Sequence, residues 1–163
     1  MATSGFSLSS LPYPLQITNL KIGIAIAEWN NHITFPLRDS AIDMLKKFGI
    51  DSNQTAILQV PGAFELPYGA QLLFEAGCDA VICLGCVIKG DTPHFEYVCQ
   101  GATEGIMRVG LDYEKPCIFG VLTTLTEKQA LSRAGGALGN KGAEAAVTAL
   151  SMISGKQYLN SIN

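Results

Sequence analysis

The sequence predicts an α/β protein, a three-layer α/β/α sandwich with a four-stranded parallel sheet and helices on both of its faces. Segments of strand-like and helix-like periodicity alternate along the 163 residues, and the connections between them are short. The run at 80–88 is apolar throughout, as expected for a strand that is covered on both faces. These three observations together indicate a parallel sheet.

Four segments have the length and the apolar character of strands. They lie at 21–27, 55–60, 80–88 and 117–122. Five helices are expected between and after them, and their segments centre on 41–48, 66–76, 95–109, a short stretch opening at Thr126, and 140–154. Thr126 followed by Gln129 is a capping-box signature. The third helix contains Gly101, Gly105 and Gly110, which lower helix propensity and therefore predict close packing against a neighbour.

The chain is expected to contain one domain at 21–156, with an N-terminal arm at 1–20 and a C-terminal tail at 157–163. The arm is rich in Ser, Pro and Leu and lacks helical periodicity. Pro12 and Pro14 favour an extended path. The arm is therefore a candidate for adding a strand to the sheet of a neighbouring subunit, although its prolines could interfere with that pairing.

Composition excludes several classes of protein. Apolar residues make up 48% of the chain and charged residues 15%, against a usual charged share of about 25%. This balance excludes intrinsic disorder and indicates that another chain covers part of the apolar surface. The net charge of −3 argues against a nucleic-acid partner. No apolar stretch reaches the roughly 20 residues that span a membrane, and no signal peptide is recognisable.

The five cysteines lie mostly inside apolar segments, which is typical of a protein from a reducing cytoplasm. Cys83 and Cys86 match C-x-x-C, but residues three apart in a strand point to opposite faces, so we expect no dithiol and no zinc site there. A nucleophilic pair of Cys86 with His94 stays open. The glycine-rich segment 135–142 lacks the preceding strand of a phosphate-binding motif and predicts a tight corner between two helices.

Ligands of open parallel sheets bind outside the carboxyl ends of the strands, so the residues that follow each strand are the candidates for a site. Trp29, the only tryptophan, follows the first strand, and a loop with Phe64 and Glu65 follows the second. The third strand is followed by the polar turn 89–94, and the fourth by two threonines. We expect these groups to converge on one edge of the sheet.

The turn Gly90-Asp91-Thr92 precedes a helix, where free backbone N–H groups and the helix dipole favour an anion such as phosphate. The alternative is an ordinary N-cap by Asp91 or Thr92. His94 lies in the first turn of that helix and could accept or pass a proton near neutral pH. Its alternative is a surface histidine with no role in chemistry, and His32 is interpreted as structural.

Three separated motifs resemble those of the 6,7-dimethyl-8-ribityllumazine synthase family. They are Pro-Gly-Ala-Phe-Glu-Leu-Pro at 61–67, Gly-Cys-Val-Ile-Lys-Gly-Asp-Thr-Pro-His-Phe-Glu-Tyr-Val at 85–98, and Arg-Ala-Gly at 133–135 followed by Gly-Asn-Lys-Gly at 139–142. The likeness runs from about 21 to 154 in the same order, and three motifs in register are far more specific than one.

The resemblance implies a flavodoxin-like strand order and the penultimate step of riboflavin biosynthesis, with no cofactor and no metal. In that step 5-amino-6-(D-ribitylamino)uracil condenses with 3,4-dihydroxy-2-butanone 4-phosphate, releasing phosphate and water. His94 would transfer protons, while Asp91, Thr92 and Arg133 would bind the phosphate. The pyrimidine and ribityl groups would be bound by Trp29, Ala63, Phe64, Glu65, Cys86, Val87, Ile88, Phe119 and Lys141, with Phe119 donated by the adjacent chain.

The resemblance also implies a pentamer. The tight corner at 135–142 favours an icosahedral shell of pentamers over a free pentamer. Riboflavin synthase is a candidate partner. Three other functions remain as alternatives: a flavin- or pteridine-binding module that uses Trp29 as a stacking platform, a shell protein with an idle pocket, and a cysteine hydrolase.

Overall fold

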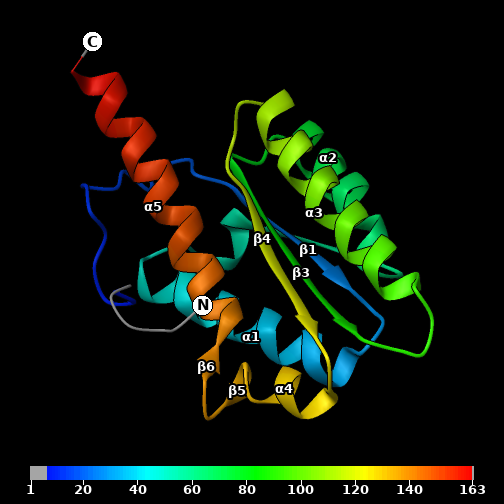
Figure 1. Ribbon diagram of the computed structural model, residues 1–163. Coiled ribbons are helices and arrows are strands. Elements are labelled where there is room, and N and C mark those ends of the chain that lie inside the picture. The colour runs from blue at the N-terminus through cyan, green and yellow to red at the C-terminus, as the bar shows by residue number, and fades with distance from the viewer. Residues whose placement is uncertain (1–6, 163) are drawn as a thin grey trace.

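The computed structural model describes residues 7–162, and its centre is a four-stranded parallel sheet (Figure 1). The strands are β1 (Ile22–Ala27), β2 (Thr55–Val60), β3 (Ala80–Ile88) and β4 (Cys117–Thr124), in the order β2-β1-β3-β4. The helices are α1 (Asn31–Lys47), α2 (Leu66–Glu75), α3 (His94–Asp112), α4 (Glu127–Leu131) and α5 (Lys141–Ser161). The predicted three-layer fold and its flavodoxin-like order are therefore confirmed.

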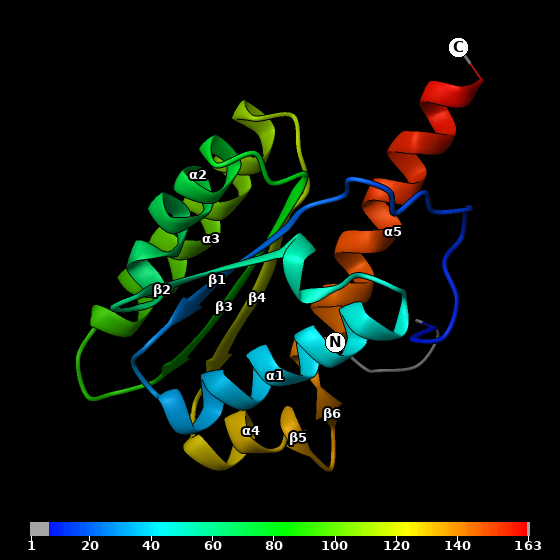
Figure 2. The same cartoon turned by 180° about the vertical axis from the view of Figure 1, so that it is seen from behind.

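Helices α1 and α5 cover one face of the sheet, and α2 and α3 cover the other (Figures 1 and 2). Alternation along the strands explains this arrangement, because successive side chains point to opposite faces. In β1, Ile24 and Ile26 join the core beneath α1 and α5, whereas Ala25 and Ala27 join the core beneath α2 and α3. Every residue of β1 is buried, as expected for a central strand with two covered faces.

The elements differ from the predicted ones mainly at their ends. Strand β4 continues two residues past the predicted 122, and α5 continues to Ser161, beyond the predicted domain end at 156. The corner predicted at 135–142 contains an antiparallel hairpin, β5 (Ala134–Gly136) with β6 (Gly139–Asn140). Gly135 and Gly139 adopt positive φ angles of 112° and 79°, a conformation that glycine adopts without strain and that allows the reversal.

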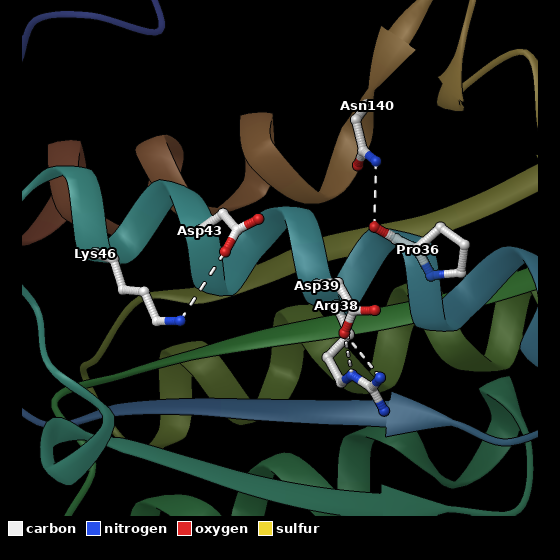
Figure 3. A network of polar contacts seen from close by, with 6 residues as sticks. All are labelled: Pro36, Arg38, Asp39, Asp43, Lys46 and Asn140. Carbon is white, nitrogen blue, oxygen red and sulfur yellow. Dashed lines mark hydrogen bonds and ion pairs between the residues drawn. The ribbon is translucent and has the colours of Figure 1, made fainter.

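The hairpin and the start of α5 are attached to α1 (Figure 3). The Asn140 side-chain amide donates to the carbonyl oxygen of Pro36 at 3.2 Å, and its Oδ1 caps α5 by accepting from the backbone N–H of Gly142 at 2.8 Å. Gly142 itself lies against the backbone of Leu37, where a Cβ atom would not fit. The hydrogen bond of Asn140 and the close contact of Gly142 thus hold the segment after β4 against α1.

The described part of the arm, residues 7–20, contains no strand and packs on its own chain. The rings of Tyr13 and Tyr158 stack with centroids 4.5 Å apart, and the backbone of Gln16 forms two hydrogen bonds with the side chain of Gln157. Residues 1–6 of the predicted arm and residue 163 of the predicted tail lie outside the described residues. Strand addition to a neighbouring subunit stays a prediction.

Within residues 7–162, no helix combines the length and the apolar character needed to cross a membrane.

Candidate functional site

A cleft of about 680 Å³ lies at the carboxyl edge of the sheet, where the sequence predicts a site. Segments that follow β1, β2 and β3 form its walls together with the first turns of α3. Its lining is mainly apolar and consists of Trp29, Asn30, Pro61, Gly62, Ala63, Phe64, Glu65, Cys86, Val87, Ile88, Gly90, Thr92, His94, Phe95, Tyr97 and Val98. Its volume falls in the usual range for small-molecule sites.

Nine of the thirteen predicted site residues line this one cleft: Trp29, Ala63, Phe64, Glu65, Cys86, Val87, Ile88, Thr92 and His94. They come from the segments after β1 and β2, from the end of β3 and from the turn into α3, which the parallel sheet brings to the same edge. The convergence that the strand ends predicted is therefore present in the structure.

The wall after β1 is formed by Trp29, whose side chain is highly exposed. The chain here continues to pair with the segment after β2, because the backbone N–H of Glu28 donates to Val60 and that of Trp29 to Pro61 at 3.0 Å. Two backbone hydrogen bonds thus hold the main chain that carries the indole next to the loop that carries Phe64 and Glu65. The ring is part of the lining of the open cleft, where an aromatic ligand could stack on it.

The wall after β2 is the short 3-10 turn η2 (Ala63–Glu65) that leads into α2. Ala63 is buried, whereas Phe64 and Glu65 are exposed. The ring of Phe64 packs against Gly101 of α3, where a Cβ atom would come within 2.6 Å of the ring. This is the close packing that the glycines of the third helix predicted.

The floor of the cleft is the end of β3. Burial, with a smaller contribution from the charge of Glu127, raises the pKa of the Cys86 thiol from its ordinary 9.0 to about 12. The side chain of Cys86 belongs to the core beneath α1 and α5, and that of Cys83 to the core beneath α2 and α3, so the predicted opposite orientation is confirmed. A thiol that stays protonated at neutral pH is a poor nucleophile, which disfavours the open pairing of Cys86 with His94.

The turn after β3 leads into α3, whose first residue is His94. Pro93 occupies the N-cap without a side-chain hydrogen bond, so the alternative in which Asp91 or Thr92 caps the helix is wrong. Asp91 lies at a smaller hollow beside the main cleft, together with Lys89 and Thr92. His94 is exposed on the cleft wall and therefore accessible to a ligand.

The ammonium group of Lys89 pairs with Glu96 at 3.0 Å. This hydrogen bond is the main cause that lowers the pKa of Glu96, whose carboxylate is therefore charged at neutral pH. The carboxylate of Glu96 thus partly neutralises the positive charge of Lys89 beside the turn. An anion bound at this turn depends correspondingly more on backbone N–H groups and on cations from elsewhere.

Three predicted residues lie away from the cleft of their own chain. Phe119 is 41% exposed on β4, the opposite edge strand from β2. The Arg133 guanidinium donates to the carbonyl of Gln129 at 2.8 Å, and Lys141 forms an ion pair with Glu144 at 2.6 Å. Within one chain, these three side chains do not complete the site.

Sequence reasoning did not select Asn30, Phe95 or Tyr97, which also line the cleft. Tyr97 could have been found from helical spacing, because it lies three residues after His94 and thus on the same face of α3. Asn30 carries no comparable signal, since its role depends on a contact with a residue 56 positions away. His32 lies outside the cleft and contacts Glu127 at 2.6 Å, in agreement with a structural role.

In the described part of the chain, no group of three or more His, Cys, Asp or Glu side chains is arranged to hold a metal ion.

Comparisons with known proteins agree with this geometry. A family profile described as 6,7-dimethyl-8-ribityllumazine synthase matches residues 19–157. A protein of that name from Porphyromonas gingivalis is 52% identical over 155 residues, covering 93% of this chain and 96% of its own length. Those from Cytophaga hutchinsonii and Phocaeicola vulgatus are 50% and 46% identical, covering 94% and 96% of this chain and 98% and 92% of their own lengths. The chain belongs to the 6,7-dimethyl-8-ribityllumazine synthase family.

Proposed function

We propose that this protein is the transferase that condenses 5-amino-6-(D-ribitylamino)uracil with 3,4-dihydroxy-2-butanone 4-phosphate to 6,7-dimethyl-8-ribityllumazine in riboflavin biosynthesis. The observation that carries the proposal is the composition of the cleft. An exposed indole, a carboxylate and an imidazole line one apolar hollow that ends at the turn before a long helix. The indole suits a planar ring, the carboxylate a polyol chain and the turn a phosphate ester, while the imidazole can transfer protons.

The pyrimidine half of the product binds between the walls after β1 and β2. Trp29 stacks on the ring, because a flat apolar face is exposed there beside Phe64 and Ala63. Glu65 accepts hydrogen bonds from the ribityl hydroxyl groups. Backbone groups of Cys86, Val87 and Ile88 contact the edge of the ring. Strand β1 ends before β3 does, and the last β1–β3 pair is Ile26 with Leu84, so the end of β3 has no backbone partner in β1.

The phosphate binds at the turn before α3. Backbone N–H groups near Asp91 and Thr92, together with the positive end of the α3 dipole, attract the anion. Arg133 supplies the cation. Because Phe119, Arg133 and Lys141 lie outside the cleft of their own chain, we propose that an adjacent subunit contributes them.

His94 moves the protons of the reaction. The 5-amino group attacks the ketone carbonyl and forms an imine with loss of water, and phosphate then leaves as an anion. Loss of the phosphate, together with a proton from the neighbouring carbon, leaves an enol that tautomerises to a second ketone. The ribitylamino nitrogen attacks this carbonyl and closes the second ring, again with loss of water. Each step takes a proton from nitrogen or carbon or delivers one to a departing oxygen, and an exposed imidazole on the cleft wall can do both. Holding both substrates together lowers the entropic part of the barrier.

We also propose a cytoplasmic homo-oligomer built from pentamers, assembled into an icosahedral shell. The exposed side chains of Met107 and Leu111 on α3 and of Phe119 on β4 support burial against another subunit. Analytical ultracentrifugation distinguishes a free pentamer from twelve assembled ones by a twelvefold difference in mass. Riboflavin synthase is the proposed partner, and its cosedimentation with the assembled protein tests that association.

The activity is tested by incubating the purified protein with both substrates and following the fluorescence of the lumazine together with phosphate release. We expect one phosphate per lumazine and no signal when either substrate is omitted. Tight binding of the lumazine without turnover would contradict the proposal and support a flavin- or pteridine-binding module. A protein that assembles into a shell but neither binds nor reacts would support the structural alternative.

A further inference from the structure

Asn30 lies between the indole of the cleft and the first residue of α1, in an uncommon backbone conformation. Its φ of 59° and ψ of 41° fall in the left-handed region, which asparagine tolerates better than most residues with a side chain. Its carbonyl oxygen accepts hydrogen bonds from the backbone N–H groups of Ile33 and Thr34, so the turn at Asn30 begins the helix. The buried hydroxyl of Thr34 donates back to Ala27 at 2.7 Å and closes the turn.

The side chain of Asn30 connects this turn to the neighbouring strand. Its Nδ2 donates to the carbonyl oxygen of Cys86 at 3.0 Å. Backbone pairing between β1 and β3 has already ended at Ile26 with Leu84, so the amide replaces the missing backbone partner beyond the last pair. On the other side, the backbone of Trp29 donates to Pro61. The chain after β1 is therefore held both to the loop after β2 and to the end of β3, and these form a wall and the floor of the cleft.

Trp29 needs such support because its own side chain is 75% exposed. Few contacts with the protein can hold a ring that is this open, so its direction depends on the backbone that carries it. The next residue in the chain is Asn30, which links that backbone to the β3 edge at Cys86. Both Trp29 and Cys86 line the cleft.

We propose that Asn30 is a positioning residue that sets the distance and angle between the Trp29 indole and the β3 edge at Cys86. Its effect on the reaction rests on the proposed function, whereas its effect on the indole does not. A planar substrate has to stack on the indole and reach the strand edge at the same time. Losing the link therefore weakens binding of the pyrimidine substrate and leaves the phosphate substrate unaffected.

Two variants separate the contribution of the Asn30 side-chain amide from that of the left-handed backbone conformation. Asn30→Gly keeps the left-handed conformation and removes the amide. Asn30→Asp keeps the shape but replaces the N–H donor with an oxygen that faces the Cys86 carbonyl. Asn31→Asp is the matched control, because Asn31 is the adjacent, exposed asparagine and lies outside the cleft lining.

For Asn30→Gly we expect the KM for the pyrimidine substrate to rise about five- to tenfold, as for the loss of one hydrogen bond, and more for Asn30→Asp. The KM for the phosphate substrate and the melting temperature of Asn30→Gly stay close to those of the unaltered protein. Trp29 is the only tryptophan, so its fluorescence reports the indole directly. Its anisotropy falls and acrylamide quenching rises in both Asn30 variants but not in Asn31→Asp.

Unchanged pyrimidine KM and unchanged anisotropy in Asn30→Gly would overturn the proposal. An equal rise of both KM values together with a lower melting temperature would also overturn it, because that pattern marks a purely structural residue. If the unaltered protein makes no lumazine, the proposed function fails. The anisotropy then still decides whether Asn30 orients the indole.

Discussion

The ring of Phe64 lies directly against Gly101, so that a Cβ atom at this position of α3 would stand 2.6 Å from Cε2 of the ring and 3.1 Å from Cδ2. Phe64 lines the cleft, whereas Gly101 is not part of the lining. The position of an exposed ring in the site therefore depends on the absence of a side chain on a neighbouring helix.

Replacing Gly101 by alanine is expected to displace the Phe64 ring into the cleft. We predict a several-fold lower kcat/KM, because a contact of this length cannot be accommodated without movement. Stability should change little, since alanine raises helix propensity by up to about 1 kcal/mol and offsets part of the strain. Steady-state kinetics and thermal unfolding measure the two effects.

Gly155→Ala in α5 is the matched control for this substitution. The nearest atoms to a Cβ there belong to Tyr13 at 3.8 Å, which is ordinary contact. This variant should be slightly more stable and fully active. Equal activity of both variants would contradict the role of Gly101.

His94→Ala is expected to lower kcat by about a hundredfold, because proton transfer by a positioned imidazole is lost while the binding groups remain. The KM values for both substrates should change little. Single-turnover fluorescence of the lumazine separates the chemical step from product release. Unchanged kcat would exclude His94 as the group that transfers protons.

Arg133→Ala is expected to raise the KM for the phosphate substrate by about tenfold or more, because a charge-assisted hydrogen bond to the anion is lost. The KM for the pyrimidine substrate should stay the same. Arg133→Lys, which keeps the charge but not the planar fork, should recover only part of the loss. If the effect fell on the pyrimidine instead, the assignment of Arg133 to the phosphate would be wrong.

Cys86→Ala should retain activity, because the pKa of about 12 keeps the thiol protonated and unreactive at neutral pH. Treatment of the native protein with iodoacetamide at pH 8 should leave Cys86 unmodified, as read by mass spectrometry of peptides. Loss of activity in Cys86→Ala would contradict this prediction, and full activity after alkylation would exclude the cysteine hydrolase alternative.

The raised pKa of Cys86 also predicts how the free energy of unfolding depends on pH. In the unfolded chain the thiol loses its proton near its ordinary pKa of 9.0, whereas the folded chain keeps the proton up to about 12. The folded state thus binds more protons in that window, and the contribution of Cys86 to the free energy of unfolding falls as pH rises through it. Denaturant titrations from pH 8 to 11 should show a smaller decline for Cys86→Ala than for the unaltered protein.

Gly142→Ala is expected to destabilise the protein by roughly 2–3 kcal/mol, because the added Cβ would overlap the backbone of Leu37, which cannot move aside like a flexible side chain. Denaturant unfolding measures the loss against the Gly155→Ala control. Since Gly142 joins the segment after β4 to α1, the hairpin at 134–140 should also become more accessible to protease. Stability equal to that of the control would contradict the close contact.

The strands and most helices could be predicted because each is encoded by a local pattern. The apolar run of β3 and the stepped apolar residues of α3 need no partner to be recognised. The hairpin at 134–140 was not predicted, because two strands of two or three residues carry no periodicity. The end of α5 was placed too early, since the exposed residues after 154 interrupt its apolar stripe.

By itself, the sequence determined the order of strands and helices, the identity of the residues at the strand ends and the motifs that place the chain in its family. Only the tertiary structure decided which of those residues share one cleft and which lie elsewhere in their own chain. The reason is physical: the contacts of Asn30 with Cys86 and of Phe64 with Gly101 join residues far apart in sequence. Such contacts follow from how the layers pack, and no local pattern contains them.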